Sequence, residues 1–153
     1  MTIAIGSDHA GFALKELIRS RLESEGHQVT DFGANSSEPA DYPDIALPLA
    51  QSVADGRFDR GIMICGTGIG SALAANKVRG ARAAVAHESY SARMSREHNN
   101  VNILCLGGRV LGPELAMEVV HAWLRAEFSG DQRHARRLDK IRRAEIQQAD
   151  SPR

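Results

Sequence analysis

The 153-residue sequence has no excess charge, because 19 Lys and Arg side chains are balanced by 19 Asp and Glu side chains. Proteins that bind nucleic acid or an anionic membrane surface by electrostatics carry a basic patch or a basic excess. The charge balance therefore argues against a nucleic-acid partner and against a membrane partner. It favours a protein that acts on a small molecule.

Long apolar runs are also absent. No window approaches the roughly 18 consecutive apolar residues of a membrane span, and residues 1–11 form neither a basic leader nor a long apolar segment. We therefore expect a cytoplasmic protein. With 42% hydrophobic and 25% charged residues, the composition is that of an ordinary globular chain. The length suits a single domain over residues 1–153.

Cysteine is scarce, and the 2 cysteines make no CxxC pair. Cys65 and Cys105 both lie in apolar runs, so they suggest neither a disulfide framework nor a zinc site. The 6 histidines show no metal-ligand spacing, which argues against a metal centre. We therefore expect neither a metal nor another cofactor.

Short apolar runs alternate with helical patterns along the whole chain. The predicted strands are 2–6, 27–32, 61–65, 81–86 and 102–106. The predicted helices are 12–25, 42–54, 71–77, 89–98, 113–124 and an Arg-rich helix over about 131–148, followed by a tail that we expect to fray. Pro113 suits the first turn of a helix, whereas Pro48 predicts a kink or a later start in the helix over 42–54.

This alternation of strands and helices is typical of an α/β protein. Right-handed crossovers then favour a Rossmann-like fold, a doubly wound five-stranded parallel sheet within a three-layer α/β/α sandwich. The carboxyl ends of parallel strands meet at one edge, where ligands of such sheets bind. That edge should gather Asp8, His9, Cys65, His87 and the segment 107–109.

The stretch 61–77 passes from a strand through a three-glycine loop into a helix. We expect Gly66, Gly68 and Gly70 to adopt positive φ angles and to bring backbone N–H groups close to a ligand. The following helix directs the positive end of its dipole to the same place. The loop is therefore predicted to bind an anion or an oxyanion.

A dinucleotide site is the alternative for this loop, because GTGIGS follows a strand and Glu88 lies about twenty residues further on. The spacing is G-x-G-x-G rather than G-x-G-x-x-G, and the loop follows the third strand instead of the first. The match is therefore poor. A nucleotide-binding module nevertheless remains a competing hypothesis, and a thiol redox protein is the other.

Cys65 has two interpretations. A free cysteine in an apolar run is usually buried packing, and this is how we interpret Cys105. Cys65, however, directly precedes an amide-rich turn and a helix N-terminus, a setting that favours a thiolate able to act as a base or nucleophile.

Other polar residues also have two interpretations. Asp8 can be a helix N-cap with His9 facing solvent, or the two can form a polar pair at a ligand site. His98 can be a surface or C-cap residue as well as a functional one. The loop over 33–43 contains Tyr42, which can reach a site at the sheet edge.

Several segments together resemble one protein family. They are GSDHAGF at 6–12, DYPD at 41–44, ICGTGIGSALAANK at 64–77, SREHNNVNILCLGGRVLG at 95–112, and the pair Arg133 and Arg137. This set is similar to the ribose-5-phosphate isomerase B family of sugar-phosphate isomerases, along the chain to about Ile146. The resemblance implies a metal-independent aldose–ketose isomerase that works as a homodimer or a dimer of dimers, with sites built between subunits.

The resemblance also implies roles for individual residues. Cys65 would be the base that moves a proton between C1 and C2. Thr67 would hold the enediolate oxygen together with the amides of Gly66, Gly68, Ile69 and Gly70. His98, with Asn99 beside it, would be the acid that opens the furanose ring. The other substrate-binding residues would be Asp8, His9 and Tyr42 at the sugar and Arg109, Arg133 and Arg137 at the phosphate.

The expected reaction interconverts ribose 5-phosphate and ribulose 5-phosphate. Members of the family also act on tetrose or hexose phosphates, so erythrulose 4-phosphate and allose 6-phosphate remain alternatives. One branch of the family places a glutamate base just after the glycine loop, where this chain has Ser71. The chain therefore matches the branch with a cysteine base. Arg133 and Arg137 stand at i and i+4, which suits a forked contact with phosphate.

Overall fold

The centre of the computed structural model, which describes residues 1–149, is one five-stranded sheet in the order β2-β1-β3-β5-β4. Each neighbouring pair of strands runs parallel. The strands are β1 (Thr2–Ser7), β2 (Gln28–Asp31), β3 (Arg60–Cys65), β4 (Ala83–Val85) and β5 (Ile103–Gly107). The predicted parallel sheet is therefore confirmed. The end of the tail that is expected to fray lies outside the described residues.

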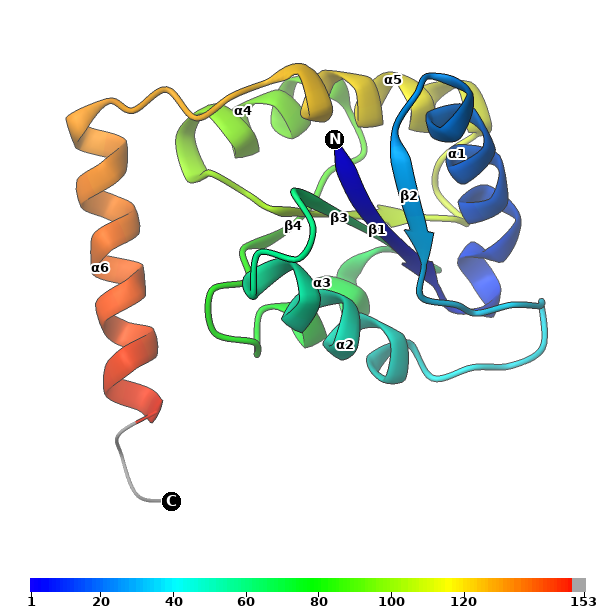
Figure 1. Cartoon of the computed structure of the whole chain (residues 1–153), viewed down its shortest axis with the longest axis horizontal. Helices are drawn as coiled ribbons and strands as arrows, with labels where there is room; N and C mark the ends of the chain where they lie inside the picture. Colours follow the sequence, from blue (N-terminus) through cyan, green and yellow to red (C-terminus); the bar gives the residue numbers. More distant parts are fainter. Residues whose placement is uncertain (150–153) are drawn as a thin grey trace.

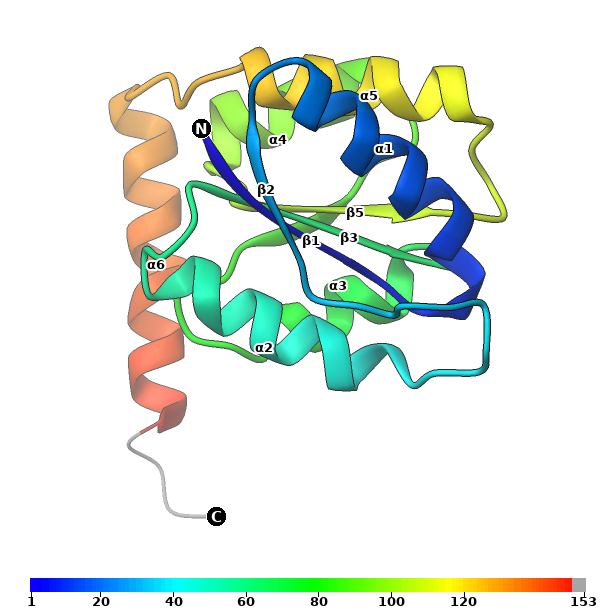
Figure 2. The same ribbon diagram turned by 45° about the vertical axis from the view of Figure 1, so that its right-hand side comes forward.

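Helices cover both faces of the sheet (Figure 1). One face carries α1 (Phe12–Ser24), α4 (Ser89–Asn99) and α5 (Pro113–Arg125), and the other carries α2 (Tyr42–Ala54) and α3 (Ile69–Ala75). Figure 2 shows the sheet between these two layers. The three-layer sandwich predicted from the sequence is thus confirmed.

A further helix, α6 (Gln132–Ala149), stands beside the sandwich rather than on a face of the sheet (Figures 1 and 2). It is the predicted Arg-rich helix, and most of its side chains are exposed. Within residues 1–149, none of the helices combines the length and the apolar character that crossing a bilayer would require.

The central strands are buried because helices pack on both of their faces. Along β3, Ile62 and Ile64 belong to the core beneath α1 and α5, whereas Met63 belongs to the core beneath α2 and α3. Successive side chains of a strand point to opposite faces, so both sets must be apolar. This explains why 62–64 is apolar without alternation.

The helix predicted over 42–54 has these bounds, whereas the helix predicted over 71–77 begins earlier than expected. The expectation of a late start at Pro48 is wrong, because α2 begins at Tyr42 and continues through this proline. Pro48 and Asp44 are both exposed, so water can replace the N–H donor that the Asp44 carbonyl loses. The helix predicted from Ser71 begins earlier, at Ile69, because Gly68 already makes the turn with a φ of 80°.

The strand order reverses between β1 and β3, since the chain turns outward to β2 and then returns past β1. Ser7 pairs with Ile64 and Cys65 pairs with Gly107. The carboxyl ends of β1, β3 and β5 therefore lie side by side at one edge. Ligands of doubly wound sheets bind at the carboxyl edge beside such a reversal.

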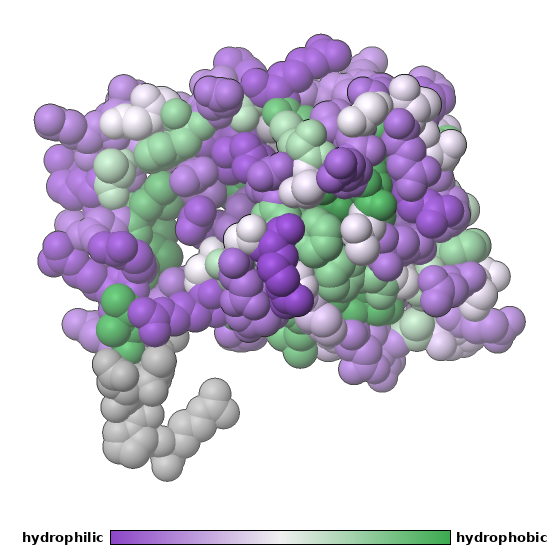
Figure 3. All heavy atoms as spheres, viewed as in Figure 1, coloured by the Kyte–Doolittle hydropathy of each residue, from purple (hydrophilic) through white to green (hydrophobic). Residues whose placement is uncertain are grey.

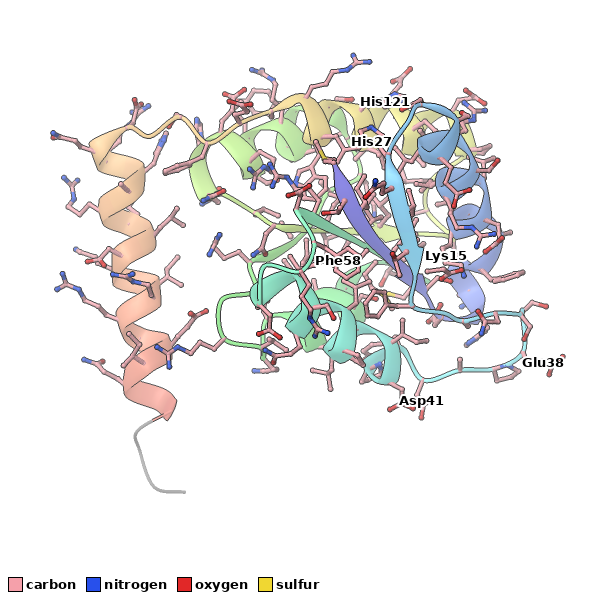
Figure 4. The ribbon with its side chains drawn as sticks, in the orientation of Figure 1. Lys15, His27, Glu38, Asp41, Phe58 and His121 are labelled. Atoms are coloured by element: carbon pink, nitrogen blue, oxygen red, sulfur yellow. The ribbon has the colours of Figure 1, made fainter. Side chains whose placement is uncertain are left out.

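Lys15 of α1 is completely buried, an unusual environment for a lysine. Its Nζ donates to Asp31 Oδ2 at 2.6 Å and to the Ala34 carbonyl at 2.7 Å. Asp31 Oδ1 in turn accepts from the amide of Gly33 at 2.8 Å. Figure 4 shows Lys15 between α1 and the end of β2. The ion pair therefore fixes the start of the loop that follows β2.

Replacing Lys15 with Met should lower the free energy of unfolding by about 3 kcal/mol, because the new side chain fills the space but leaves Asp31 without its buried partner. Urea unfolding at a fixed protein concentration measures this change. Lys77→Met, at an exposed lysine, is the matched control and should alter it by less than about 0.5 kcal/mol. A loss below about 1 kcal/mol for Lys15→Met would contradict the assigned role.

Candidate active site

The short turn after β1, η1 (His9–Gly11), is built around Asp8. Asp8 Oδ1 accepts from the amides of Ala10 at 2.9 Å and Gly11 at 3.1 Å. The amide of Asp8 donates to the Ile64 carbonyl at 3.1 Å, and the residue is 6% exposed. The N-cap interpretation of Asp8 is therefore confirmed, and the cap fixes the turn against the end of β3.

His9 is half-buried and does not simply face solvent. Its Nδ1 lies 3.2 Å from the amide nitrogen of Ala40 and 3.4 Å from the carbonyl oxygen of the same residue. Nδ1 accepts from the amide in one tautomer and donates to the carbonyl in the other. In both cases Nε2 is the ring nitrogen left for a ligand, and the loop that precedes α2 orients the ring.

That loop, residues 33–41, is anchored at both ends. Near its start, the backbone amide of Ser7 donates to the Gly33 carbonyl at 2.6 Å, and the backbone carbonyl of Ser7 accepts from the amide of Ala34 at 2.5 Å. Near its end, the bond to His9 holds Ala40. Figure 4 shows Glu38 at the outer turn and Asp41 where the loop returns to α2. The loop therefore forms one wall beside the turn after β1.

Cys65 is the last residue of β3 and is 4% exposed. The amide of Gly68 donates to its Sγ at 3.1 Å. An N–H donor directed at sulfur stabilises the negative charge of a thiolate, so the turn holds Cys65 in a setting that suits a base. Cys105 is fully buried, and burial raises the pKa of the Cys105 thiol. Its interpretation as packing is confirmed.

Thr67 lies at the exposed crest of the same turn. Its Oγ1 accepts from the amide of Ile69 at 3.3 Å. Because that oxygen is the acceptor in this bond, the hydroxyl proton remains able to donate to a ligand. Ile69 itself is 57% exposed, next to this hydroxyl.

Two of the three loop glycines, Gly68 and Gly70, are needed, and for different reasons. Among them only Gly68 has a positive φ, 80°, so the prediction of positive φ for Gly66 and Gly70 is wrong. A Cβ built on Gly70 would lie 2.6 Å from Cζ of Tyr42, whose ring covers the first turn of α3. A Cβ on Gly66 would lie 3.7 Å from Nη1 of Arg109 and would fit. Gly70 is therefore set by a side chain, not by its backbone angles.

The segment 107–109 closes the third side of the Cys65 turn. The amide of Gly108 donates to the Cys65 carbonyl at 2.8 Å, and the amide of Arg109 donates to the Gly66 carbonyl at 3.1 Å. The amide of Gly107 donates to Nε2 of His87 at 3.0 Å. These bonds hold the end of β5 against the turn, and they bring the Arg109 guanidinium beside Gly66.

The structure thus brings many predicted site residues together at the carboxyl edge of the sheet. They are Asp8, His9, Tyr42, Cys65, Gly66, Thr67, Gly68, Ile69, Gly70 and Arg109, with His87 next to them.

The other predicted site residues form a second cluster. His98 and Asn99 end α4, and Asn100 is the C-cap with a φ of 48°, so the C-cap interpretation of His98 is wrong. The His98 ring lies 4.2 Å from the ring of His134 on α6, centroid to centroid. Arg133 and Arg137 lie exposed on the same helix.

His134 connects α6 to the sandwich. It is buried, and its Nδ1 lies 2.9 Å from Oγ of Ser129. The amide of Ser129 donates to the Glu97 carbonyl of α4 at 3.0 Å. Burial lowers the pKa of His134, and the nearby His98 and Arg133 lower it further.

The two clusters lie at opposite ends of the strands: the Cys65 cluster at the carboxyl ends and the His98 cluster near the amino end of β5. Cys65 is paired with Gly107 at the end of β5, whereas His98 precedes the start of β5, where Ile103 pairs with Gly61. The two pairs are four residue steps apart along the strand, which is about 13 Å at about 3.3 Å per residue. One chain therefore does not bring His98, Asn99, Arg133 or Arg137 to its own Cys65.

A hollow of about 470 Å³ separates α6 from the edge strand β4. Its apolar lining includes Ala83 and Ala84 of the strand and Leu138, Ile141 and Ala144 of α6, and its polar lining consists of Asn76, Arg82, Ser95, Asn99 and Glu145. Figure 3 shows apolar side chains along α6 beside this hollow. The apolar side of α6 thus lies over an incompletely filled space.

Among the described residues near Cys65 there is neither a cluster of metal ligands nor a glutamate just after the glycine loop. In the part of the chain that the structure describes, no group of three or more His, Cys, Asp or Glu side chains is placed to hold a metal ion. Ser71, where one branch of the resembling family has a glutamate, is fully buried in α3. Cys65 is therefore the candidate base of this edge.

The sequence patterns indicate no structural role for three residues that make buried or half-buried contacts: Lys15, His87 and His134. A lysine at the same helical spacing as Ile18 and Leu22 stands out on an apolar stripe, and this signal could have revealed Lys15. The sequence predicts that His87 lies at the carboxyl edge of the sheet but indicates no contact for it. His134 gives no comparable signal, since its burial depends on Ser129 and on the path of the chain into α6.

Comparison with known proteins gives a family and close relatives. Residues 3–141 match the family described as Ribose/Galactose Isomerase. The chain is 50% identical over 139 residues to ribose-5-phosphate isomerase B of Escherichia coli (strain K12), covering 91% of this chain and 93% of that protein. It is 49% identical over 131 residues to D-erythrulose-4-phosphate isomerase of Pectobacterium atrosepticum, covering 85% and 86%.

Solved structures share the fold over nearly the whole chain. Ribose-5-phosphate isomerase B of Clostridium thermocellum superposes with a TM-score of 0.94 at 54% identity, over 96% of this chain and 99% of that chain. The enzyme of the same name from Mycoplasma genitalium, solved with bound ribulose 5-phosphate, has a TM-score of 0.90 at 41% identity, over 95% and 96%.

The lowered pKa of His134 predicts a specific pH dependence of stability. Below the usual histidine pKa of about 6.5, the unfolded chain binds a proton that the folded chain still excludes, so stability falls as the pH falls. The melting temperature of the wild type should therefore drop more between about pH 7.5 and about pH 5.5 than that of His134→Asn. The melting temperature of each protein is compared with its own value at the higher pH, so the loss of stability caused by the substitution itself cancels. Equal slopes would contradict the prediction.

Proposed function

Since the chain belongs to the ribose/galactose isomerase family, we propose that it interconverts ribose 5-phosphate and ribulose 5-phosphate. Membership of this family makes it an aldose–ketose isomerase of sugar phosphates. The observation that carries the proposal is the Cys65 thiol, buried at the carboxyl edge beside the reversal of strand order and hydrogen bonded by the Gly68 amide.

In the proposed reaction Cys65 acts as a thiolate on the open-chain aldose. It removes the proton from C2 and returns a proton to C1, while the hydroxyl proton moves from O2 to O1, so the composition does not change. A C–H bond beside a carbonyl is weakly acidic, and the step needs donors for the developing oxyanion, each worth a few kcal/mol. The Thr67 hydroxyl and the loop amides supply such donors. The mechanism uses no metal ion.

Asp8 and His9 are proposed to contact the sugar. Asp8 Oδ1 is engaged in the cap, so its second carboxylate oxygen is the one available to a substrate hydroxyl. His9 presents Nε2, because Nδ1 is engaged by the backbone of Ala40. Tyr42 forms the wall opposite, over Gly70. Each of these side chains is held by the protein before substrate arrives, which reduces the entropy lost on binding.

We further propose that the working enzyme is a homodimer, or a dimer of such dimers, with each site shared between two copies. His98 and Asn99 of the partner subunit would then open the furanose ring at Cys65. Arg133 and Arg137 of the partner subunit would join Arg109 at the phosphate, as a forked clamp. The positions of these residues at opposite ends of the strands of one chain support this arrangement, as does the apolar hollow beside α6.

Erythrulose 4-phosphate is the second candidate substrate, because a relative 49% identical over 131 residues is named for it. The two substrates share the carbonyl and phosphate ends, so the residues proposed above serve both.

We also propose that the enzyme works in the cytoplasm. Its two free cysteines fit a reducing compartment.

The test of the chemistry is Cys65→Ala. This variant should lose at least about a hundredfold in kcat on ribose 5-phosphate, because it removes the general base, while still binding ribulose 5-phosphate. The assay measures ketose formation directly, with erythrulose 4-phosphate in a parallel arm. Cys105→Ala is the matched control: it removes a thiol of the same kind from the core and should change kcat less than about threefold.

Near-normal turnover by Cys65→Ala would remove this residue from the role of base. A wild type that isomerises erythrulose 4-phosphate far better than ribose 5-phosphate would keep the mechanism and change the substrate. No isomerisation of either compound, with tight binding of NAD or ATP, would favour the nucleotide-binding module.

A mixed dimer tests the shared site. Cys65→Ala and His98→Ala should each be impaired in both sites of their own dimers, but in a dimer of the two variants one site receives both lesions and the other receives none. Random reassembly of an equal mixture makes about half of the dimers mixed, so about a quarter of the wild-type activity should return. The assay uses cyclic substrate, since ring opening is the step assigned to His98.

Activity equal to the mean of the two parents, after subunit exchange has been verified by mass, would place both residues in one chain's site. A mixture of Cys65→Ala with Cys65→Ser is the matched control and should recover nothing, because both sites then carry a lesion at the same position.

A further inference from the structure

We propose that His87 is a positioning residue that fixes the oxyanion-binding turn of this enzyme through the backbone of Gly107. The inference rests on the proposed function, because it concerns the same site. His87 follows β4 by two residues and is half-buried. Its Nε2 accepts from the amide of Gly107 at 3.0 Å.

The first step of the argument is the shape of the sheet edge. β4 is short, and its last pair with β5 joins Val85 to Cys105. One further backbone bond follows, from the amide of Ala86 to the Cys105 carbonyl at 3.3 Å. Beyond that point β5 continues to Gly107, and none of the strands within residues 1–149 pairs with it on the β4 side. A buried strand cannot leave its amide without an acceptor at low cost.

The second step is the direction of the Gly107 amide. Groups along a strand alternate between the two neighbours. The amide of Gly108 points to β3, where it donates to the Cys65 carbonyl at 2.8 Å, and the Cys105 carbonyl points to β4. The Gly107 amide therefore points to the side that β4 has left. The His87 ring takes the place of the missing strand, and its Nε2 supplies the acceptor.

The third step is the contact with the catalytic turn. A Cβ built on Gly107 would lie 3.0 Å from both His87 Nε2 and the Cα of Thr67. The ring and the backbone of Thr67 thus both lie close to the position that a side chain of residue 107 would occupy. Gly107 is also the register partner of Cys65. A displacement of Gly107 would therefore move both the base and the residue proposed to hold the enediolate oxygen.

The fourth step is chemical. Imidazole can accept at Nε2 only when it is neutral with its proton on Nδ1. The carboxylate of Glu88 cannot serve instead, since it accepts from the amides of Tyr90 and Ser91, both at 2.6 Å, as the N-cap of α4. The role of His87 is thus that of a fixed acceptor for the Gly107 amide, and Gly107 is paired with Cys65.

The experiment compares two replacements of similar size. His87→Leu fills the space but cannot accept a hydrogen bond, whereas the side-chain oxygen of His87→Gln can reach the Gly107 amide. Misplacement of catalytic groups by about 1 Å costs up to about a hundredfold in rate. We expect His87→Leu to lose about tenfold or more in kcat on ribose 5-phosphate with KM changed less than about threefold, and His87→Gln to keep most of the wild-type kcat. His121→Leu, on the distant α5 surface, should leave kcat unchanged.

Hydrogen exchange of the Gly107 amide gives a readout that does not depend on activity. The amide should exchange faster in His87→Leu than in the wild type and should regain protection in His87→Gln. Wild-type kcat in His87→Leu, equal losses in the two variants, or a loss confined to KM would each overturn the inference. If the wild type isomerises no sugar phosphate, the proposed function fails, while unchanged exchange in His87→Leu would separately reject the role of His87.

Discussion

The site depends on the close approach of three backbone turns at one edge of the sheet. A Cβ on Gly11 would lie 2.5 Å from the Ile64 carbonyl oxygen, and a Cβ on Gly108 would lie 2.6 Å from the Ala10 carbonyl oxygen. Only glycine allows such contacts. The turns after β1 and β5 are therefore locked against the end of β3. The chemical groups above them inherit their positions from backbone contacts rather than from long side chains.

Much of this arrangement could be predicted from the sequence. Apolar runs without alternation identify strands buried on both faces, and the carboxyl ends of such strands share an edge. The motif around Cys65 resembles a known family strongly enough to propose a base and its donors. The cap of α4 is less obvious from sequence: Glu88, not a short polar residue, fills it. The features predicted correctly are those that depend on residues close together in the chain.

The features that could not be predicted depend on distant contacts. Lys15 is buried because Asp31 and the Ala34 carbonyl meet it from another segment. Gly70 is required by the ring of Tyr42, not by its own φ. His87 matters because β4 ends earlier than β5, a difference in strand length that no local pattern reveals. The position of α6 likewise follows from Ser129 and His134 near its start.

The loop between β2 and α2 is fastened at both ends, through Ser7 near its start and His9 near its end. Its outer part, around Glu38, makes no contribution to either anchor. Insertions, deletions and substitutions there are absorbed without moving the base or its donors. Two parts of the same edge therefore differ in how much sequence change they tolerate. Gly11 and Gly108 leave no room for a side chain, whereas the residues around Glu38 can vary without disturbing the turns.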